Sequence, residues 1–216
     1  MKPRCPNQRN RALTLTEVLV VVVIVGVLAC FLLPALATAR KKAQKINCNN
    51  YLKQIGLGFH IWESDHTNLY PMSISTNLGG TLEYVARGET FRHFQVMSNE
   101  LVTPYILVCP ADVRPRAKDF GSTFRNTNVS YFVGVDADDS RPQDLLSGDR
   151  NIVGGTKLAN GILEITTNQL VGWSSEMHDG VGNIGLADGS VQTVSITGFA
   201  ELIQQTGVAT NRLAIP

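Results

Sequence analysis

The sequence predicts an α+β fold in which one long N-terminal helix leads into a head built on an antiparallel β-sheet. Three observations support this prediction. Residues 18–37 form an uncharged apolar run, residues 38–65 have the spacing of an amphipathic helix, and residues 66–216 are broken into short segments by Gly, Asn, Asp and Pro. A chain of 216 residues has room for one modest domain and an appended segment.

Composition narrows the class of protein. Hydrophobic residues make up 44% of the chain and charged residues 17%, whereas an average soluble domain has roughly 25% charged residues. This composition excludes a disordered, collagen-like or disulfide-dense chain. The first twelve residues contain four basic and no acidic residues, which leaves 15 basic and 18 acidic residues in the remainder. That near-neutral body gives no electrostatic case for nucleic-acid binding.

The apolar run is long enough to cross a membrane. Twenty helical residues span about 30 Å, which is the thickness of a bilayer hydrocarbon core. Basic residues both precede and follow the run, so the positive-inside rule leaves its orientation open. By itself the run is compatible with a permanent single-span anchor. It is also compatible with a secretory signal peptide that is cut after the small-x-small sequence at residues 35–37.

The junction before the run favours a third interpretation. Residues 12–17 read A-L-T-L-T-E, which resembles the class III signal of type IV pilins and type II secretion pseudopilins, usually G-F-T-L-x-E before a long apolar segment. Thr14, Leu15 and Glu17 match that pattern, whereas Ala12 replaces Gly and Leu13 replaces Phe. The resemblance implies that a prepilin peptidase cuts between Ala12 and Leu13 on the cytoplasmic side and methylates the new amino terminus.

Glu17 has two interpretations. As the third residue of a helix whose N-cap is Thr14, it would complete a capping box and interact favourably with the helix dipole. The resemblance implies a second role, in which the carboxylate pairs with the free amino terminus of a neighbouring subunit during filament assembly. The same resemblance equates Pro34 with the proline that bends many pilin helices partway through the apolar segment.

After the apolar run the predicted helix becomes amphipathic. Its apolar residues recur every three or four positions and form one stripe. The stripe comprises Cys48, Leu52, Ile55, Phe59 and Trp62. Gly56 and Gly58 each weaken a helix by up to about 1 kcal/mol relative to Ala, so packing against the head is expected to sustain it. The pattern predicts one continuous helix over residues 13–65.

The head is predicted to combine short strands with short helices. The expected strands are 105–109, 129–135, 161–166, 169–174, 184–187 and 190–196. The expected helices are 91–101 and 198–205, the second capped by Thr197. Asp188-Gly189 separates the last two strands and is a strong signal for a two-residue hairpin.

A second resemblance lies in the head. Nine residues separate His178 from Asp188-Gly189, which is similar to the H-x9-D-G pattern of a large pilin-like family with the same N-terminal signal; residues 45–60 and 109–112 also look like that family. From the residues alone, Asp188-Gly189 is turn chemistry and His178 is a loop residue that hydrogen-bonds the hairpin. A catalytic or metal-binding pair of His178 and Asp188 is the alternative.

Acidic residues and cysteines raise two further possibilities. Asp136, Asp138 and Asp139 belong to an acidic stretch that runs to residue 149, and such oxygen-rich loops can bind Ca²⁺. Solvated loop acids are the other interpretation, and no other cofactor is expected. A disulfide between Cys48 and Cys109 would persist outside the cytoplasm and contribute about 4 kcal/mol by the chain-entropy model. Two buried thiols are the alternative.

These features together predict a structural protein and not an enzyme. Residues 1–12 would be a prepilin leader, 13–37 a transmembrane and assembly helix, 38–65 its amphipathic continuation, and 66–216 the head. The expected partners are prepilin peptidase, the inner membrane, and other pilin or pseudopilin subunits in a type II secretion pseudopilus or type IV pilus-like filament. The head would lie in the periplasm or on an extracellular filament. The competing hypothesis is a membrane-anchored periplasmic binding module that never polymerises.

Overall fold

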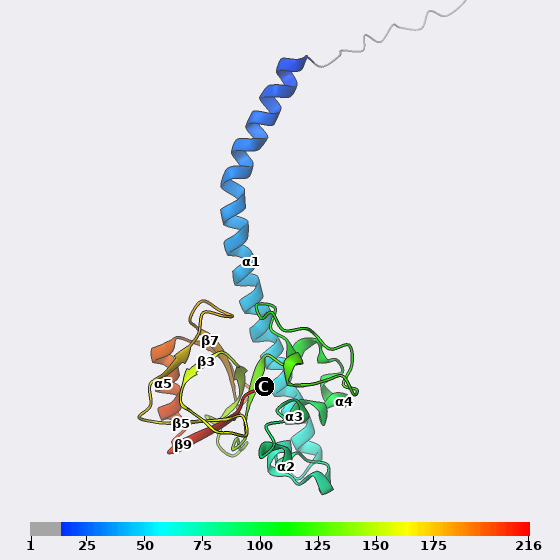
Figure 1. The fold of residues 1–216 in the computed structure, drawn as a ribbon, viewed down its shortest axis with the longest axis vertical. Helices are drawn as coiled ribbons and strands as arrows, with labels where there is room; N and C mark the ends of the chain where they lie inside the picture. The colour runs from blue at the N-terminus through cyan, green and yellow to red at the C-terminus, as the bar shows by residue number, and fades with distance from the viewer. Residues whose placement is uncertain (1–13) are drawn as a thin grey trace, which may run out of the picture. The chain divides into compact units, whose positions relative to one another are not determined.

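The computed structural model describes residues 14–216, and its longest element is the helix α1, Leu15–Asp65 (Figure 1). The prediction of one continuous helix is confirmed, and α1 ends at the predicted residue. The chain divides into two compact units between Lys42 and Ala43. Residues 15–42 of α1, the apolar half, belong to the first unit, and residues 43–65, the packed half, belong to the second.

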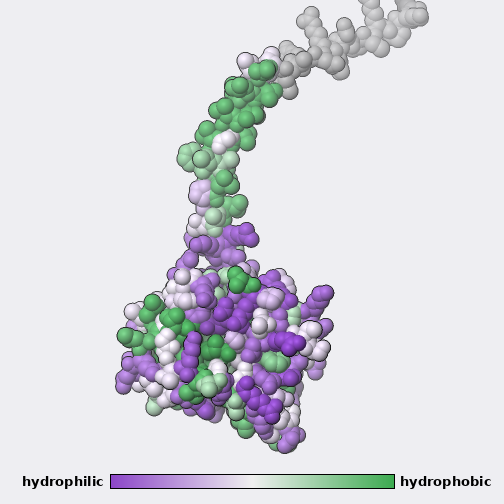
Figure 2. Space-filling model, viewed as in Figure 1, coloured by the Kyte–Doolittle hydropathy of each residue, from purple (hydrophilic) through white to green (hydrophobic). Residues whose placement is uncertain are grey.

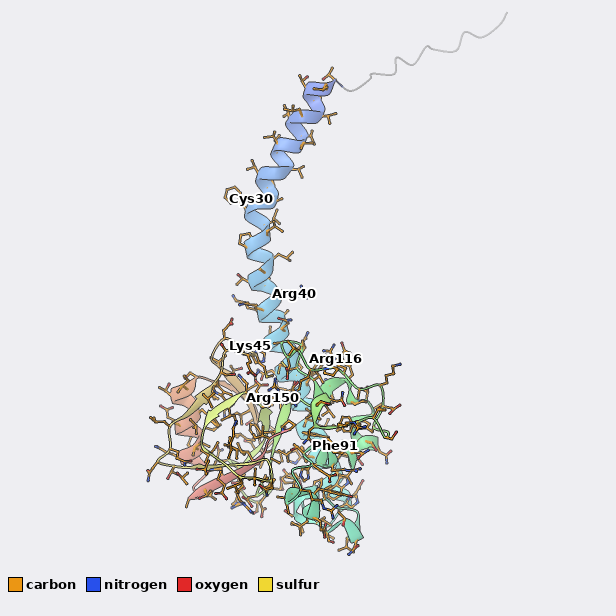
Figure 3. All side chains as sticks on the ribbon, in the orientation of Figure 1. Cys30, Arg40, Lys45, Phe91, Arg116 and Arg150 are labelled. Atoms are coloured by element: carbon orange, nitrogen blue, oxygen red, sulfur yellow. The ribbon has the colours of Figure 1, made fainter. Side chains whose placement is uncertain are left out.

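The apolar half of α1 exposes all of its side chains. Val18 is 50% exposed and Phe31 is 75% exposed, and Figure 3 shows the side chains around Cys30 projecting away from the helix axis. The apolar window has a mean hydropathy of 3.1 and no buried residue, so α1 is long and apolar enough to cross a membrane. Figure 2 shows mostly hydrophobic surface over this half, which becomes hydrophilic at its end next to the head. Pro34 lies inside α1 without ending it.

The packed half of α1 buries the predicted stripe. All five apolar residues of the stripe are buried, from Cys48 to Trp62. Fully burying such a side chain contributes about 1.5–3 kcal/mol, which offsets the weak helix propensity of the two glycines. Gly58 has a packing role, because a Cβ at that position would lie 2.8 Å from a methyl carbon of Leu101.

Short helices connect the packed half to the first sheet strand. They are η1 Pro71–Ser73, η2 Thr76–Leu78, α2 Leu82–Val85, α3 Phe91–Gln95, α4 Ser98–Leu101, η3 Pro104–Leu107 and η4 Asn126–Asn128. The predicted helix 91–101 is therefore two helices, α3 and α4. The predicted strand 105–109 is wrong. Pro104 sits in the first turn of η3, and the Thr103 hydroxyl accepts a hydrogen bond from Tyr105 N at 3.3 Å, so this segment begins as a 3₁₀ turn.

The head contains a seven-stranded antiparallel sheet with the strand order β4-β5-β9-β1-β2-β7-β8, and a two-stranded sheet formed by β3 and β6. The strands are β1 Tyr131–Gly134, β2 Leu145–Asp149, β3 Ile152–Gly154, β4 Thr156–Lys157, β5 Ile162–Thr166, β6 Val171–Trp173, β7 Gly182–Leu186, β8 Val191–Val194 and β9 Thr210–Ala214. The antiparallel α+β prediction is confirmed. The sequence did not predict β2 or β9, which lie on either side of β1.

The large sheet is buried on both faces. Tyr131 and Val133 of β1 pack into the cluster that contains the stripe of α1, whereas Phe132 packs into a second cluster with Phe199. This alternation is the period of two expected for a strand. Phe199 belongs to α5, Ile196–Gln205, which Figure 1 shows across the sheet from α1. Helices therefore cover both faces of the central strands.

The predicted hairpin at the end of the sheet is confirmed, but its loop has three residues, 187–189, and not the two expected, because Leu186 N donates a hydrogen bond to Ser190 O across the turn. Strands β7 and β8 pair antiparallel around Asp188-Gly189, and Gly189 has a φ of 79° in the left-handed region that such turns require. The helix that follows, α5, is also confirmed, but its N-cap differs from the prediction. Ser195 and not Thr197 caps it, since the Ser195 hydroxyl accepts a hydrogen bond from Gly198 N at 3.2 Å.

Candidate functional site

Thr14 and Glu17 form a capping box at the start of α1. The backbone N–H and the hydroxyl of Thr14 each donate to Glu17 Oε2 at 2.8 Å, and Glu17 N–H donates to Thr14 Oγ1 at 3.3 Å. The capping interpretation of Glu17 is therefore confirmed. Both bonds to the carboxylate use Oε2, and Glu17 is exposed. The carboxylate consequently remains accessible to a cation from outside the chain.

The two residues predicted for cleavage and methylation, Ala12 and Leu13, lie outside the described residues. Cleavage and methylation at these positions therefore stay predictions. The resemblance also singled out Pro34, whose carbonyl accepts a hydrogen bond from the Thr38 hydroxyl at 3.1 Å. The structure does not test a role for Pro34 in assembly.

In the head, His178 and Asp188-Gly189 have separate surroundings. Asp188 stabilises its own turn by accepting a hydrogen bond from Ser190 N at 2.8 Å. His178 lies in the loop between β6 and β7, and its Nε2 is 3.3 Å from Cys109 Sγ and 3.5 Å from Asp149 Oδ2. The turn interpretation of Asp188-Gly189 is confirmed. The His178 side chain contacts Cys109 and Asp149. The structure therefore supports neither a hydrogen bond from His178 to the hairpin nor a pair of His178 with Asp188.

Four side chains from distant parts of the sequence meet around His178. Cys48 comes from the packed half of α1, Cys109 from the loop after η3, Asp149 from the end of β2 and His178 from the β6–β7 loop. One donor atom of each lies within 4.8 Å of those of the other three, and all four residues are buried. We call these four residues the thiol cluster.

Cys48 and Cys109 are free thiols in this structure. Of the two possibilities that the sequence left open, the structure therefore contains the buried thiols and not the disulfide. Cys48 Sγ lies 3.1 Å from the Tyr131 hydroxyl and donates to Asp149 Oδ1 at 3.3 Å. The Cys109 segment is held close to α1, because Gln44 Nε2 donates to the Pro110 carbonyl at 3.0 Å.

Burial and mutual contact perturb every titratable group in the thiol cluster. Burial raises the pKa of the Cys48 thiol, whereas a hydrogen bond from Cys48, aided by His178, lowers the pKa of Cys109 to about 5. Burial also raises the pKa of Asp149 to about 7. For His178, burial acts to lower the pKa, but Cys109 and Asp149 outweigh it, and the pKa is raised. The group thus favours negative charge on Cys109 and positive charge on His178.

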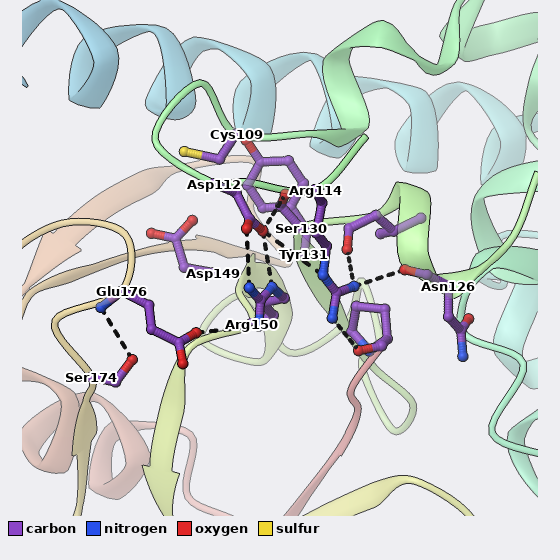
Figure 4. A network of polar contacts seen from close by, with 12 residues as sticks. Cys109, Asp112, Arg114, Asn126, Ser130, Tyr131, Asp149, Arg150, Ser174 and Glu176 are labelled. Carbon is purple, nitrogen blue, oxygen red and sulfur yellow. Dashed lines mark hydrogen bonds and ion pairs between the residues drawn. The ribbon is translucent and has the colours of Figure 1, made fainter. Parts of the chain in front are cut away.

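A second polar network lies beside the thiol cluster (Figure 4). Arg150 donates to both oxygens of Asp112, at 2.9 and 3.0 Å, and Ser130 donates to Asp112 Oδ2 at 2.7 Å. Glu176 pairs with Arg150 at 3.4 Å. Burial acts to raise the pKa of Asp112, but the bonds from Arg150 and Ser130 outweigh it, and the pKa is lowered. This bidentate pair is of the strong, geometrically specific kind.

The two networks share their supporting segments. Residues 109–112 supply Cys109 to the thiol cluster and Asp112 to the ion-pair network, and residues 149–150 and 176–178 each also supply one side chain to each network. The Arg150 ion pairs therefore fix three of the four segments that carry the thiol cluster.

The three aspartates considered for calcium have separate partners. Asp136 forms a bidentate pair with Arg212, Asp138 accepts bonds from its own turn, and Asp139 Oδ1 lies 3.6 Å from His60 Nδ1. Within the described residues, Asp139 is grouped with His60 and Glu63, and not with the other two aspartates. Calcium binding stays a prediction to which this geometry lends no support.

The fold and the start of α1 define a class of protein. An apolar, membrane-competent N-terminal helix with a capped glutamate in its first turn, continuing into an antiparallel sheet, is a pilin-like architecture. Residues 7–32 match the family model of the prokaryotic N-terminal methylation motif. This match confirms the predicted prepilin signal and indicates a type IV pilin-like substrate of prepilin processing. Comparison with curated proteins and with solved structures finds no match. The matched motif ends before the head, so the H-x9-D-G resemblance stays a prediction.

Sequence reasoning did not identify Asp149 as a partner of the cysteines. It grouped Asp149 with the acidic stretch, although this residue follows the apolar pair Leu145-Leu146 and ends a fully buried strand. The segment L-L-S-G-D carries no local signal that marks its acid as buried. Tyr131 and Asn183, which contact the cluster from β1 and β7, had no distinguishing local signal.

Proposed function

We propose that the chain is a pilin-like structural subunit that prepilin peptidase cuts between Ala12 and Leu13. The processed chain assembles through the apolar half of α1 into a type II secretion pseudopilus or type IV pilus-like filament. One observation carries the proposal: the methylation motif continues directly into a fully exposed apolar helix whose first turn holds an accessible carboxylate.

The exposed helix supports both stages of this life cycle. Apolar surface in water costs about 25 cal/mol per Å², so the apolar half of α1 requires lipid or other apolar helices around it. In this proposal the inner membrane covers it before assembly and neighbouring copies of the helix cover it in the filament. The subunit is thus a single-pass inner-membrane protein whose head lies in the periplasm or on an extracellular filament.

Glu17 supplies the specificity of assembly in this proposal. A carboxylate within an apolar environment is unfavourable by up to about 2.5–3.5 kcal/mol at a membrane centre. Thr14 offsets part of that cost within the chain, because it donates two hydrogen bonds to Oε2. A positively charged amino terminus from a neighbouring subunit would compensate the remaining charge. A simple membrane anchor gains only the cap from Glu17.

Replacing Glu17 by Gln separates the two roles. Glutamine also serves at this position of a capping box, so Glu17→Gln keeps the cap and removes the charge. Glu17→Ala removes the charge and the side-chain half of the cap, and leaves only the backbone bond to Thr14 Oγ1. In cells with an active prepilin peptidase and filament system, we expect both variants to be processed like the wild type. We expect both to lose at least about tenfold in the sheared filament fraction, the change that 1.4 kcal/mol produces.

Two outcomes would contradict the proposal. If Glu17→Gln assembles like the wild type while Glu17→Ala does not, the carboxylate serves only as a cap. If the processed wild-type chain never enters a filament fraction, the chain is the anchored, non-polymerising module.

A further inference from the structure

All four residues of the thiol cluster belong to the second compact unit, and their geometry suggests a ligand. Within the described residues, the thiol cluster is one of two groups of His, Cys, Asp and Glu close enough to share an ion, and its members are all buried. The other group, His60, Glu63 and Asp139, includes an exposed carboxylate.

The distances within the thiol cluster are those of ligands around one point. Zinc binds sulfur at about 2.3 Å and nitrogen or oxygen at about 2.0–2.2 Å in a tetrahedron, so its ligand atoms lie about 3.3–3.8 Å apart. The structure places Cys109 Sγ 3.3 Å from His178 Nε2, Cys48 Sγ 3.3 Å from Asp149 Oδ1, and Asp149 Oδ2 3.5 Å from His178 Nε2. Each separation is close to one edge of such a tetrahedron. Asp149 contacts Cys48 through Oδ1 and His178 through Oδ2, and it would ligate through one of these two oxygens.

The contacts of His178 distinguish this arrangement from a nucleophilic relay. In a relay the nucleophile and the acid contact opposite nitrogens of the imidazole ring, so that a proton can pass through the ring. Here Cys109 and Asp149 both approach the same nitrogen, Nε2. The side chains of His178 and Asp149 are 3% and 0% exposed, so the cluster also lacks access for a substrate. Convergence on one nitrogen in a closed site is the geometry of metal ligation.

The surroundings of Asp149 and Cys48 resemble an outer ligand shell. Asn183 donates to Asp149 Oδ2 from its backbone N at 2.8 Å and from Nδ2 at 2.9 Å, and Thr193 in turn donates to Asn183 Oδ1 at 2.7 Å. Tyr131 contacts Cys48 Sγ at 3.1 Å. Such partners orient ligands and tune the affinity of a metal site. The Arg150 ion pairs add a second constraint, on the three segments that carry Cys109, Asp149 and His178.

We propose that Cys48, Cys109, Asp149 and His178 bind one Zn²⁺ ion in a closed structural site. Two thiolates, an imidazole and a carboxylate are all zinc ligands, and four protein ligands leave no open coordination position. Iron–sulfur clusters favour four thiolates and calcium takes only oxygen ligands. The ion would join the packed half of α1 to β2 and to two loops, and thereby stabilise the attachment of the helix to the sheet.

The first test is the metal content and thiol state of the full-length protein. The protein would be extracted in detergent without chelators. Elemental mass spectrometry would then measure the bound metal, and alkylation would count the free thiols. We expect about one zinc per chain. After removal of the metal with a chelator, Zn²⁺ alone should restore the lost thermal stability. Co²⁺ should produce the thiolate-to-metal charge-transfer absorption of sulfur ligation.

Matched variants assign the ion to this cluster. We expect Cys48→Ser and His178→Asn to reduce bound zinc at least about tenfold, whereas Cys30→Ser, which alters an exposed cysteine of the apolar half, should leave it unchanged. Should the ligand variants fail to fold, Asn183→Ala retains all four ligands and removes the side-chain bond to Asp149. Its zinc affinity should fall about 10–100-fold.

Three results would overturn the proposal. The first is a native Cys48–Cys109 disulfide whose reduction does not create zinc binding. The second is a reduced protein that takes up no Zn²⁺ and gains no thermal stability from it. The third is zinc that remains at the wild-type level in folded His178→Asn protein, because that ion would lie elsewhere.

Discussion

The two halves of α1 share one helix but have opposite surroundings. In the packed half, five apolar residues at three- and four-residue intervals are buried, whereas half of the residues between them are exposed. In the apolar half the hydrophobic residues have no such interval, and every one of them is exposed. The first pattern indicates a partner within the chain. The second indicates an apolar environment on all sides, which residues 14–216 do not supply.

The largest expected loss of stability comes from a substitution in the packed half. Phe59 is fully buried and lies edge-to-face with Tyr70 and Phe94, with ring centroids 5.8 and 6.1 Å apart. Phe59→Ala should therefore lower the free energy of unfolding of the head by about 3–5 kcal/mol. Phe31→Ala makes the same change at an exposed site of the apolar half and should leave this free energy unchanged. Denaturant unfolding in detergent, followed by near-UV circular dichroism, measures both variants. Equal losses of unfolding free energy in the two variants would contradict the difference between the two halves of α1.

A second expected effect is a pH dependence of the head's unfolding free energy, which a buried histidine produces. His93 in α3 is fully buried; its Nδ1 lies 2.7 Å from Thr81 Oγ1, and its Nε2 has no hydrogen-bond partner. Burial lowers the pKa of His93 to about 4, below the ordinary value of 6.5. Between these values the unfolded chain binds the proton more readily than the folded head. The free energy of unfolding therefore falls as pH drops from 6.5 to 4, by about 3 kcal/mol from this residue.

The variant His93→Gln isolates that contribution. Glutamine cannot be protonated in this range, so the difference in unfolding free energy between wild type and variant should shrink by about 3 kcal/mol from pH 7 to pH 4. Other groups titrate in both proteins and cancel in the difference. A difference that is constant over this range would show that His93 is not buried in its neutral form.

The smallest expected effect lies at the start of the apolar half. Thr14→Ala removes the hydroxyl that accepts from Glu17 N and donates to its carboxylate, which should destabilise the first turn of α1 by about 1 kcal/mol. Thr38→Ala is the matched control, because the Thr38 hydroxyl bonds to a carbonyl within the helix and caps nothing. Hydrogen exchange of the first turn in detergent should accelerate about fivefold in Thr14→Ala only. Similar exchange rates in the two variants would exclude the cap as a stabilising element.

Features that depend only on residues close together in the sequence were predicted correctly. The stripe of α1, the Asp188-Gly189 hairpin and the capping box each depend on residues within about one or two turns of chain, and all three are confirmed. Strand β2 was missed because both of its faces are buried, which removes the alternation that marks a strand. Segment 105–109 was misassigned because Pro104 and Thr103 outweigh its apolar composition.

The arrangement of the thiol cluster could not be predicted from local patterns either. Cys48, Cys109 and His178 were each notable in the sequence, but their common partner Asp149 was not. Its position is set by the pairing of β2 with β1, which aligns Asp149 with Tyr131, and by hydrogen bonds from Asn183 on β7. Sheet pairing between distant segments is not encoded in any local pattern, so neither Asp149 nor the arrangement of the four residues was predictable.

The identity of the amino terminus tests the central claim about α1 most directly. Terminal peptide sequencing and intact mass of the membrane-extracted protein, from cells with an active prepilin peptidase, would determine it. We expect a chain that begins at N-methylated Leu13 and keeps the apolar half attached to the head. A chain that begins at Thr38 would show ordinary signal-peptide removal, and an uncut chain from Met1 would show a plain anchor; either result would contradict prepilin processing.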